Sequence, residues 1–166
     1  MSATIRLTQV VHAPQDVLFD LARSVDAHQA STSQTEEEAI GGKMEGLLDL
    51  HDEVTWRARH FGVRQTLTSR MTAFDRPRHF RDSMVSGAFK HFDHDHFFHL
   101  QEDGTVLMED VFSYSAPLGP LGWLAERLFL TAYMTRFLKE RNAILVALAE
   151  SNDWQQYLPD RKVSDE

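Results

Sequence analysis

The chain has 166 residues, of which 42% are hydrophobic and 25% charged; this composition is typical of one globular domain and excludes an intrinsically disordered protein. Its formal net charge of −8, with Lys and Arg scattered along the chain, gives no electrostatic reason to bind nucleic acid or an anionic membrane. Cysteine is absent, which excludes disulfides, thiolate nucleophiles and cysteine-based zinc sites.

The first residues, 1–14, lack the basic region and apolar core of a signal peptide. No segment approaches the roughly 20 consecutive apolar residues that span a bilayer. We therefore expect a cytoplasmic protein whose partners include neither a nucleic acid nor a membrane. The sequence leaves its oligomeric state open.

The N-terminal part of the chain predicts one strand followed by helices. Alternating side chains over residues 4–11 indicate a strand that ends before Pro14. Proline suits the first position of a helix, and Val17, Leu18 and Leu21 follow at helical spacing. Residues 14–31 are therefore expected to form one helix or two short ones on one side of a sheet.

The middle of the chain predicts a series of strands. Five strand-like segments lie between residues 52 and 116, and they are separated by Gly62, Arg76-Pro77, Gly87 and Asp103-Gly104. Short connections between consecutive strands favour an antiparallel meander.

The pattern changes after Pro117, where leucines from Leu121 to Leu148 recur at steps of three and four residues. This spacing predicts one amphipathic helix of about thirty residues. We expect an α+β domain over residues 1–150, in which this helix lies along the concave face of a curved antiparallel sheet, and a C-terminal tail over residues 151–166.

Five segments carry a family resemblance. The segment "VVHAPQDVLFDLA" (10–22) resembles the opening of the SRPBCC (START-like) superfamily, and "GTVLMEDVFSYSAPLGPLGWLAERL" (104–128) resembles its last strand, Pro-Leu-Gly turn and closing helix. The segment "SGAFKHFDHDHFF" (86–98) is similar to a strand of a little-characterised bacterial branch, close to the polyketide cyclase/dehydrase-like subgroup, which "VDAHQAS" (25–31) and "VTWRARHFGVRQTLTS" (54–69) also resemble.

The resemblance covers nearly the whole chain and implies the helix-grip fold, with two short helices after strand 1. It also implies a cavity between the sheet and the long helix that holds an apolar or amphiphilic small molecule. The superfamily includes lipid carriers, hormone receptors, cyclases, hydratases and oxygenase domains, so the resemblance does not define one activity.

Strand parity predicts which side chains face that cavity, because residues two apart share a face of a sheet. In residues 89–100 we assign the face of Phe92, His94, His96 and Phe98 inward, since its large aromatics suit a core. The opposite face, with His91, Asp93 and Asp95, is expected to be solvated. Applied to the other strands and the helix, the same reasoning predicts a ligand site made of Trp56, His60, Asp82, Met84, Phe92, His94, His96, Phe98, Met108, Asp110, Phe112, Tyr114 and Leu128.

The inward polar residues leave two interpretations open. His60, His94, His96 and Asp110 either anchor the polar end of a ligand in an apolar lining, or Asp110 bonds His94 or His96 only to satisfy buried groups. A catalytic alternative uses His94 and Asp110 as the acid/base pair of a cofactor-independent cyclase or dehydratase. A partner-binding regulator with a collapsed cavity is a third alternative.

A metal site is also considered. His94 and His96 share a face, and with His60 or Asp110 they would supply three ligands for zinc or iron. However, Gly87 and Glu102 lie at the wrong distances from this pair for a cupin, and a long helix follows. We therefore predict no metal ligands and no cofactor; phosphate-loop and dinucleotide motifs are absent from the sequence as well.

Several charged residues are assigned to the surface. The acidic run Glu36-Glu37-Glu38 is expected to be an exposed edge, and Asp26 and His28 are expected to cap a loop rather than line the pocket mouth. Arg141 is placed on the solvated side of the long helix, although one arginine of that helix is long enough to reach an inward acid.

Overall fold

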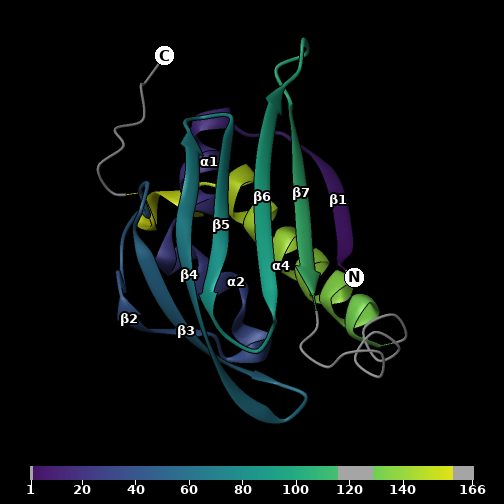
Figure 1. Ribbon diagram of the computed structural model, residues 1–166. Coiled ribbons are helices and arrows are strands. Elements are labelled where there is room, and N and C mark those ends of the chain that lie inside the picture. Colours follow the sequence, from purple (N-terminus) through teal and green to yellow (C-terminus); the bar gives the residue numbers. More distant parts are fainter. Residues whose placement is uncertain (1, 116–128, 159–166) are drawn as a thin grey trace.

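A curved antiparallel sheet and one long helix dominate the structure (Figure 1). The computed structural model describes residues 2–115 and 129–158. The elements in chain order are β1 (Ala3–Val11), α1 (Gln15–Ala22), α2 (Val25–Ser31), η1 (Ser33–Thr35), β2 (Glu38–Gly42), β3 (Glu53–His60), β4 (Val63–Asp75), β5 (His79–Ser86), β6 (His91–Leu100), β7 (Val106–Ser115), α4 (Thr131–Glu150) and η3 (Asp153–Gln156).

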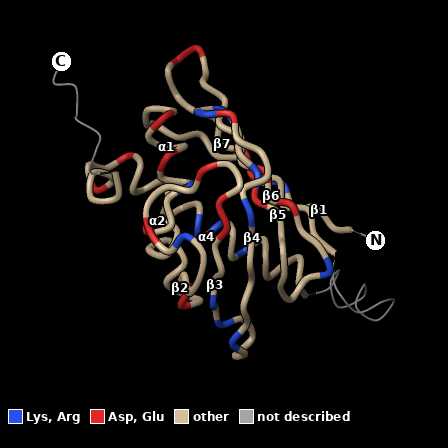
Figure 2. Tube along the Cα trace, turned by 60° about the vertical axis from the view of Figure 1, so that its left-hand side comes forward, with Lys and Arg blue, Asp and Glu red and all other residues tan. Residues whose placement is uncertain are grey.

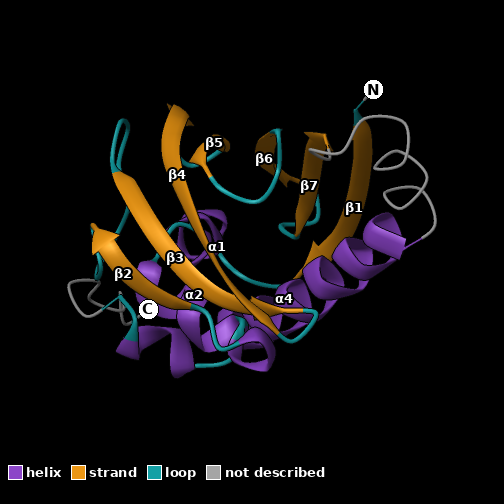
Figure 3. Ribbon diagram, turned by 60° about the horizontal axis from the view of Figure 1, so that its bottom comes forward, coloured by secondary structure: helices purple, strands orange, loops and turns teal. Residues whose placement is uncertain are grey.

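Within the described residues, the sheet has seven strands in the order β1-β7-β6-β5-β4-β3-β2. Strands β3 to β7 form the predicted meander, β2 extends it beside β3, and β1 completes the sheet beside β7. Register shifts occur between β2 and β3 at Ala39/Gly41 and between β4 and β5 at Thr68/Ser69 and Met71/Ala73. Such irregularities bend a strand and increase its twist, and Figure 3 shows the sheet curving around α4. The predicted helix-grip α+β fold is confirmed.

The two short helices after β1 begin where local chemistry favours a helix start. Pro14 precedes α1 with a φ of −58°, and the side chain of Asp16 accepts a hydrogen bond from the backbone N–H of Val17 at 2.9 Å. The N-cap of α2 is Ser24, whose hydroxyl accepts a hydrogen bond from the N–H of Ala27 at 3.2 Å.

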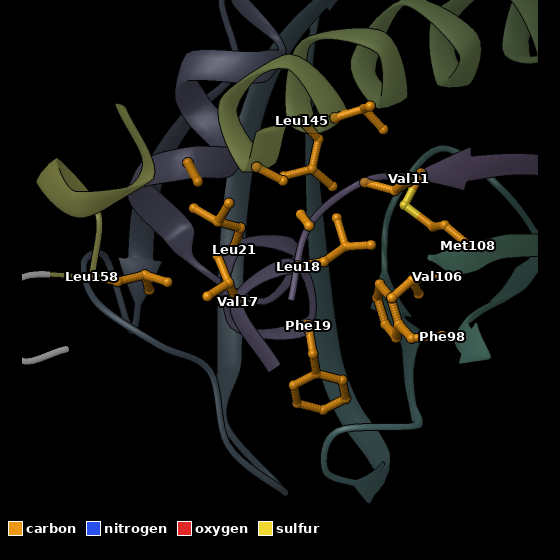
Figure 4. Close-up of a cluster of buried hydrophobic side chains, with 14 of the residues drawn as sticks. Val11, Val17, Leu18, Phe19, Leu21, Phe98, Val106, Met108, Leu145 and Leu158 are labelled. Atoms are coloured by element: carbon orange, nitrogen blue, oxygen red, sulfur yellow. The ribbon is translucent and has the colours of Figure 1, made fainter. Parts of the chain in front are cut away.

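The largest buried cluster lies where α1 meets the sheet and the C-terminal half of α4 (Figure 4). At its centre, the ring of Phe19 packs edge-on against Phe74, Phe80 and Phe98, with ring centroids 5.4–5.5 Å apart. Edge-to-face packing is favourable because the positive ring edge meets a negative ring face. Helix α4 contributes Leu145 to the same cluster.

The segment after α4 differs from the expected tail in its first half. Leu158 is buried in the cluster around Phe19, and Trp154 and Tyr157 pack against it. The chain therefore continues to contribute to the core through residue 158. The domain boundary at residue 150 remains a prediction.

The convex face of the sheet carries pairs of opposite charge, and Figure 2 shows acidic and basic residues interspersed along the chain. Asp95 accepts two hydrogen bonds of 2.8 Å from Arg81 and lies 2.7 Å from the ring of His79. Asp95 lies on the outer face as predicted, but it is buried under these two side chains rather than solvated.

The beginning of the predicted thirty-residue helix, and with it Leu128, lies outside the described residues. The described part of that helix is α4, from Thr131 to Glu150. In the described part of the chain, no helix combines the length and the apolarity needed to cross a membrane.

Candidate functional site

A cavity of about 270 Å³ lies between the inner face of the sheet and α4. Strand parity turns Trp56, Ala58 and His60 of β3 toward it. Helix α4 contributes the face that carries Tyr133, Phe137 and Arg141, which are four residues apart along the helix. The lining side chains are mostly apolar or aromatic; they belong to His28, Glu37, Trp56, Ala58, His60, Phe61, Gln65, Thr66, Leu67, Ser69, Asp82, Ala88, Phe89, Phe92, His94, Phe112, Leu130, Tyr133, Met134, Phe137, Leu138 and Arg141.

The predicted site residues divide into three groups. Those that line the cavity are Trp56, His60, Asp82, Phe92, His94 and Phe112. His96 lines a smaller adjoining cavity of about 70 Å³, which it shares with Asp82, His94 and Arg141, and Asp110 lies behind the two histidines. The remaining described residues, Met84, Phe98, Met108 and Tyr114, pack in hydrophobic clusters instead of lining either cavity.

The misassignment of this last group has a physical reason. Parity predicts the face of a strand, but α1 covers part of the concave face. Phe98 and Met108 point inward at the end of the sheet under α1, where Phe19 fills the space. Tyr114, at the opposite end of β7, packs under the start of α4, and its hydroxyl lies 2.8 Å from that of Thr131.

Asp110 forms the centre of a buried polar cluster between β7, β6 and α4, and it is 1% exposed. Its Oδ1 lies 2.7 Å from Nδ1 of His96 and 3.5 Å from Nε2 of His94. Its Oδ2 accepts hydrogen bonds from the side chains of Asn142 and, at 3.4 Å, of Arg141. The predicted partnership of Asp110 with the inward histidines is therefore present, and His96 is the closer of the two.

Asp82 extends this cluster toward the cavity. Its Oδ1 lies 3.2 Å from Nε2 of His96, so the ring of His96 lies between two carboxylates. The ring of His94 lies beside that of His96, with 3.9 Å between centroids. Nε2 of His94 is buried and has no hydrogen-bond partner among the described residues.

Burial and the neighbouring groups set the charge states of the cluster. Burial and the adjacent His96 lower the pKa of His94 to about 4, so His94 is neutral at pH 7. Burial opposes ionisation of Asp110, but Arg141 and His96 outweigh it and hold the pKa of Asp110 well below its usual range. Burial also lowers the pKa of His96, but the two carboxylates more than compensate, and the net shift is upward.

A second polar group lies on the other side of the cavity, and of its members the sequence predicted only His60 as a site residue. Nδ1 of His60 lies 2.8 Å from the hydroxyl of Tyr133 on α4. Nε2 of His28 lies 2.6 Å from Oε2 of Glu37, whose other oxygen is 3.9 Å from Nε2 of His60. The ring of His28 also packs on Trp56, with 4.3 Å between centroids.

Two expectations about charged residues are wrong. Glu37 is not part of an exposed edge but lines the cavity, directly after Glu36, whose positive φ of 52° turns the chain at the end of η1. His28 lines the cavity rather than capping a loop; Asp26, by contrast, accepts a hydrogen bond from the loop N–H of Gly46. Burial raises the pKa of Glu37, but the hydrogen bond from His28 and nearby charges outweigh it, so the net shift is downward.

Arg141 is likewise buried rather than solvated, and it reaches the inward acid Asp110. A signal for it was present in the sequence, because Tyr133, Phe137 and Arg141 recur at steps of four and share one helix face. No comparable pattern marks Glu37.

The arrangement supplies apolar walls and two separate polar groups, which suits an amphiphilic molecule whose polar atoms need fixed partners. It also places imidazoles beside carboxylates, the combination used in acid/base chemistry. Within the described residues, Asp82, His94 and His96 each offer one ligand atom within 4.8 Å of the others, a set able to hold a metal ion.

No protein-family model matches the chain, and no curated protein matches it significantly in sequence. Solved structures match nearly all of it. Zhui aromatase/cyclase from Streptomyces sp. R1128 superposes with a TM-score of 0.74 and 16% identity, over 90% of this chain and 94% of that one. TTHA0849 from Thermus thermophilus has a TM-score of 0.71 and 15% identity, over 96% and 100% of the two chains.

Major latex-like protein 151 from Panax ginseng has a TM-score of 0.64 and 13% identity, over 90% of this chain and 99% of that one. Identities at this level carry information about the fold and not about a shared ligand or reaction. The chain has the helix-grip fold that these solved structures share.

Proposed function

We propose that the protein binds an apolar or amphiphilic small molecule in the cavity between the sheet and α4. The observation that carries this proposal is a cavity of about 270 Å³ with mostly apolar walls and polar groups gathered at two places. Burial of an apolar ligand body supplies affinity, and a few fixed polar atoms supply orientation.

The volume and charges narrow the ligand class. Small-molecule pockets are typically roughly 300–1,000 Å³, so this cavity favours a compact molecule over a long-chain lipid. Both signs of charge are present in its lining, and they are largely paired: Glu37 with His28 of the lining, and Arg141 with Asp110, which lies behind the wall. A neutral ligand with a hydroxyl or carbonyl group therefore fits better than an ionised one.

A native mass spectrum of the untagged protein as purified, compared with its denatured mass, is the first test. We expect the native mass to exceed the denatured mass by that of an organic ligand. If the protein is purified without a ligand, we expect it to bind one neutral apolar molecule when such molecules are added. A protein that remains bare and takes up none of a panel of such molecules would argue against a binding function.

A cavity-filling substitution locates the site. Ala58→Phe places a large side chain in the cavity, while Arg59→Phe places the same side chain on the opposite, exposed face of β3. With the neutral fluorophore N-phenyl-1-naphthylamine as the probe, we expect at least a tenfold loss of affinity in Ala58→Phe and little change in Arg59→Phe. Equal binding by both variants would place the probe elsewhere, and thermal unfolding checks that both are folded.

A second candidate function is a cyclase- or dehydratase-type reaction with His94 and Asp110 as an acid/base pair. It is favoured by the neutral His94 in the cavity wall, 3.5 Å from Asp110, and by the fold shared with an aromatase/cyclase. Its test is deuterium exchange at the central carbon of acetylacetone, an enolisable ketone. Exchange no faster than in buffer, or equally fast in wild type and His94→Gln, removes this candidate.

A third candidate, a partner-binding regulator, was expected to have a collapsed cavity. The open cavity among the described residues gives it no support.

A further inference from the structure

The polar end of the cavity contains a set of potential metal ligands assembled by the register of two strands. Asp82 of β5 lies directly opposite His94 of β6, and His96 follows two residues later on the same face. One ligand atom from each of the three lies within 4.8 Å of the other two. The sequence suggested His60 or Asp110 as the third ligand beside the two histidines; the register places Asp82 there instead.

His94 supplies independent evidence for a missing partner. It is 5% exposed and it lines both cavities. Its buried Nε2 has no hydrogen-bond partner among the described residues, and neither has Oδ1 of Asp110, which lies 3.5 Å away. A buried polar atom without a partner lowers stability, so native proteins almost always satisfy such atoms with protein groups, water or ions.

His96 is held in the orientation of a metal ligand. Its Nδ1 lies 2.7 Å from Asp110, which leaves Nε2 directed toward Asp82 at 3.2 Å. A histidine ligand usually donates its other ring N–H to a carboxylate, and that partner fixes the tautomer and the ring. Asp110 is held in turn by Asn142 and Arg141 of α4.

The spacing and the charge both suit a cation. A tetrahedral ion with bonds of about 2.0–2.1 Å separates neighbouring ligand atoms by roughly 3.3 Å, close to the 3.2 Å between His96 Nε2 and Asp82 Oδ1. The cluster contains two carboxylates, those of Asp82 and Asp110, and one guanidinium among its described members, that of Arg141. Two imidazoles and one carboxylate favour a transition metal over calcium or magnesium.

We propose that Asp82, His94 and His96 bind one divalent transition-metal ion of the zinc class, with Asp110 as the residue that positions His96. Three protein ligands leave a coordination position open, the pattern of reactive rather than purely structural sites. Since Asp82 and His94 line the cavity wall, this position faces the cavity. The proposal goes beyond small-molecule binding and does not depend on it.

The test is a titration of the untagged, chelator-treated protein with cobalt(II), followed by visible absorption and by calorimetry, with zinc(II) as competitor. We expect one ion per chain, and an affinity that falls at least tenfold in Asp82→Asn and in His94→Gln. Asp110→Asn should weaken binding about 10- to 100-fold, as loss of a partner of a metal-bound histidine does.

The outer face of the same two strands offers a matched control, because His79 of β5 and Asp95 of β6 form a His–Asp pair there. His79→Gln should leave cobalt affinity unchanged, and zinc should raise the melting temperature of this variant and of wild type but not of Asp82→Asn. Circular dichroism shows which variants are folded.

Three results would overturn the proposal: a wild-type protein that binds no cobalt, equal binding by wild type and by folded Asp82→Asn and His94→Gln, or binding lost in His79→Gln alone. No organic ligand is present in these measurements. A protein that binds no cobalt would therefore disprove the metal site without affecting the proposal of small-molecule binding. A protein that binds cobalt but no organic probe would support the metal site and argue against small-molecule binding.

Discussion

The side-chain amide of Asn142, in the middle of α4, donates a hydrogen bond to the carboxylate of Asp110, in the middle of β7. Both residues are buried, and the adjacent Arg141 reaches the same carboxylate oxygen at 3.4 Å. The long helix is thus held to the sheet by a polar contact as well as by its apolar face. Because such a contact has one geometry, it fixes where α4 lies along β7 in a way that leucines alone do not.

Removing the charge of Asp110 should strongly destabilise the fold. Asp110→Asn keeps the shape of the side chain but leaves the buried Arg141 without its carboxylate, so we expect the free energy of unfolding in urea to fall by about 3–5 kcal/mol. The control is Asp93→Asn, on the outer face of β6 and partly exposed, for which about 1 kcal/mol or less is expected. Similar losses in the two variants would show that the buried cluster is not a major source of stability.

Phe19 should be among the most sensitive core positions. It is fully buried and meets three other phenylalanine rings edge-on. Phe19→Ala should lower the free energy of unfolding by about 3–5 kcal/mol, measured in urea, because it removes the ring and leaves a cavity. Phe61→Ala, at a position that is 63% exposed, should cost far less, and a comparable loss there would contradict the assignment of the core.

The hydrogen bond between Tyr133 and His60 should contribute modestly to stability and strongly to the orientation of the histidine. Tyr133→Phe removes the hydroxyl that lies 2.8 Å from Nδ1 of His60, and we expect a loss of about 1 kcal/mol in urea unfolding. The ring nitrogen signals of His60 in an NMR spectrum should shift. Tyr157→Phe, in the cluster around Phe19, should leave those signals in place; unchanged signals in Tyr133→Phe would show that the contact does not hold the ring.

Asp20 should make stability depend on acid pH. Its carboxylate is buried, which opposes ionisation, but hydrogen bonds from Arg76 and Arg23 outweigh burial and lower its pKa below the ordinary 3.8. A carboxyl whose pKa is lower in the folded than in the unfolded state contributes stability above the unfolded value, and this contribution is lost as the pH falls through the folded value.

The comparison of Asp20→Asn with wild type isolates that contribution. At pH 7 the free energy of unfolding of the variant in urea should be lower by about 3 kcal/mol. This value is at the lower end of the range for a broken buried ion pair, because Arg23 keeps Asp49 as a partner. The difference should shrink as the pH falls below 3.8. A difference that stays constant over this range would mean that the charge of Asp20 is not responsible.

Much of the candidate site could be predicted from the sequence because strand geometry is local. The period of two in residues 89–100 correctly separated inward Phe92 and His94 from outward Asp93. The same rule turned Asp110 inward on β7. Parity cannot say how far along a strand the cavity extends, and this is why Phe98, which lies under α1, was assigned to the lining.

The other omissions required knowledge of the three-dimensional arrangement. Glu37 sits in an acidic run whose composition indicates a surface, and only the turn at Glu36 brings it to the cavity. Pairing Asp82 with His94 needed the register of β5 against β6, which turn composition does not define. Arg141 looked solvated because charge on a helix usually is, and its burial depends on Asp110 being opposite.

The pairing of β1 with β7 has a consequence for how the chain folds as it is made. Ala3 lies opposite Tyr114 and Val11 opposite Val106, so of the strands in this sheet the one that is synthesised first pairs with the one that is synthesised last. At about 5–20 residues per second, β1 waits roughly 5–20 s on the ribosome before β7 exists. Closure of so long a loop also slows folding in the test tube. Until β7 is made, the apolar side of β1 is not covered by its partner strand. During this time the nascent chain is most prone to aggregate and most accessible to chaperones.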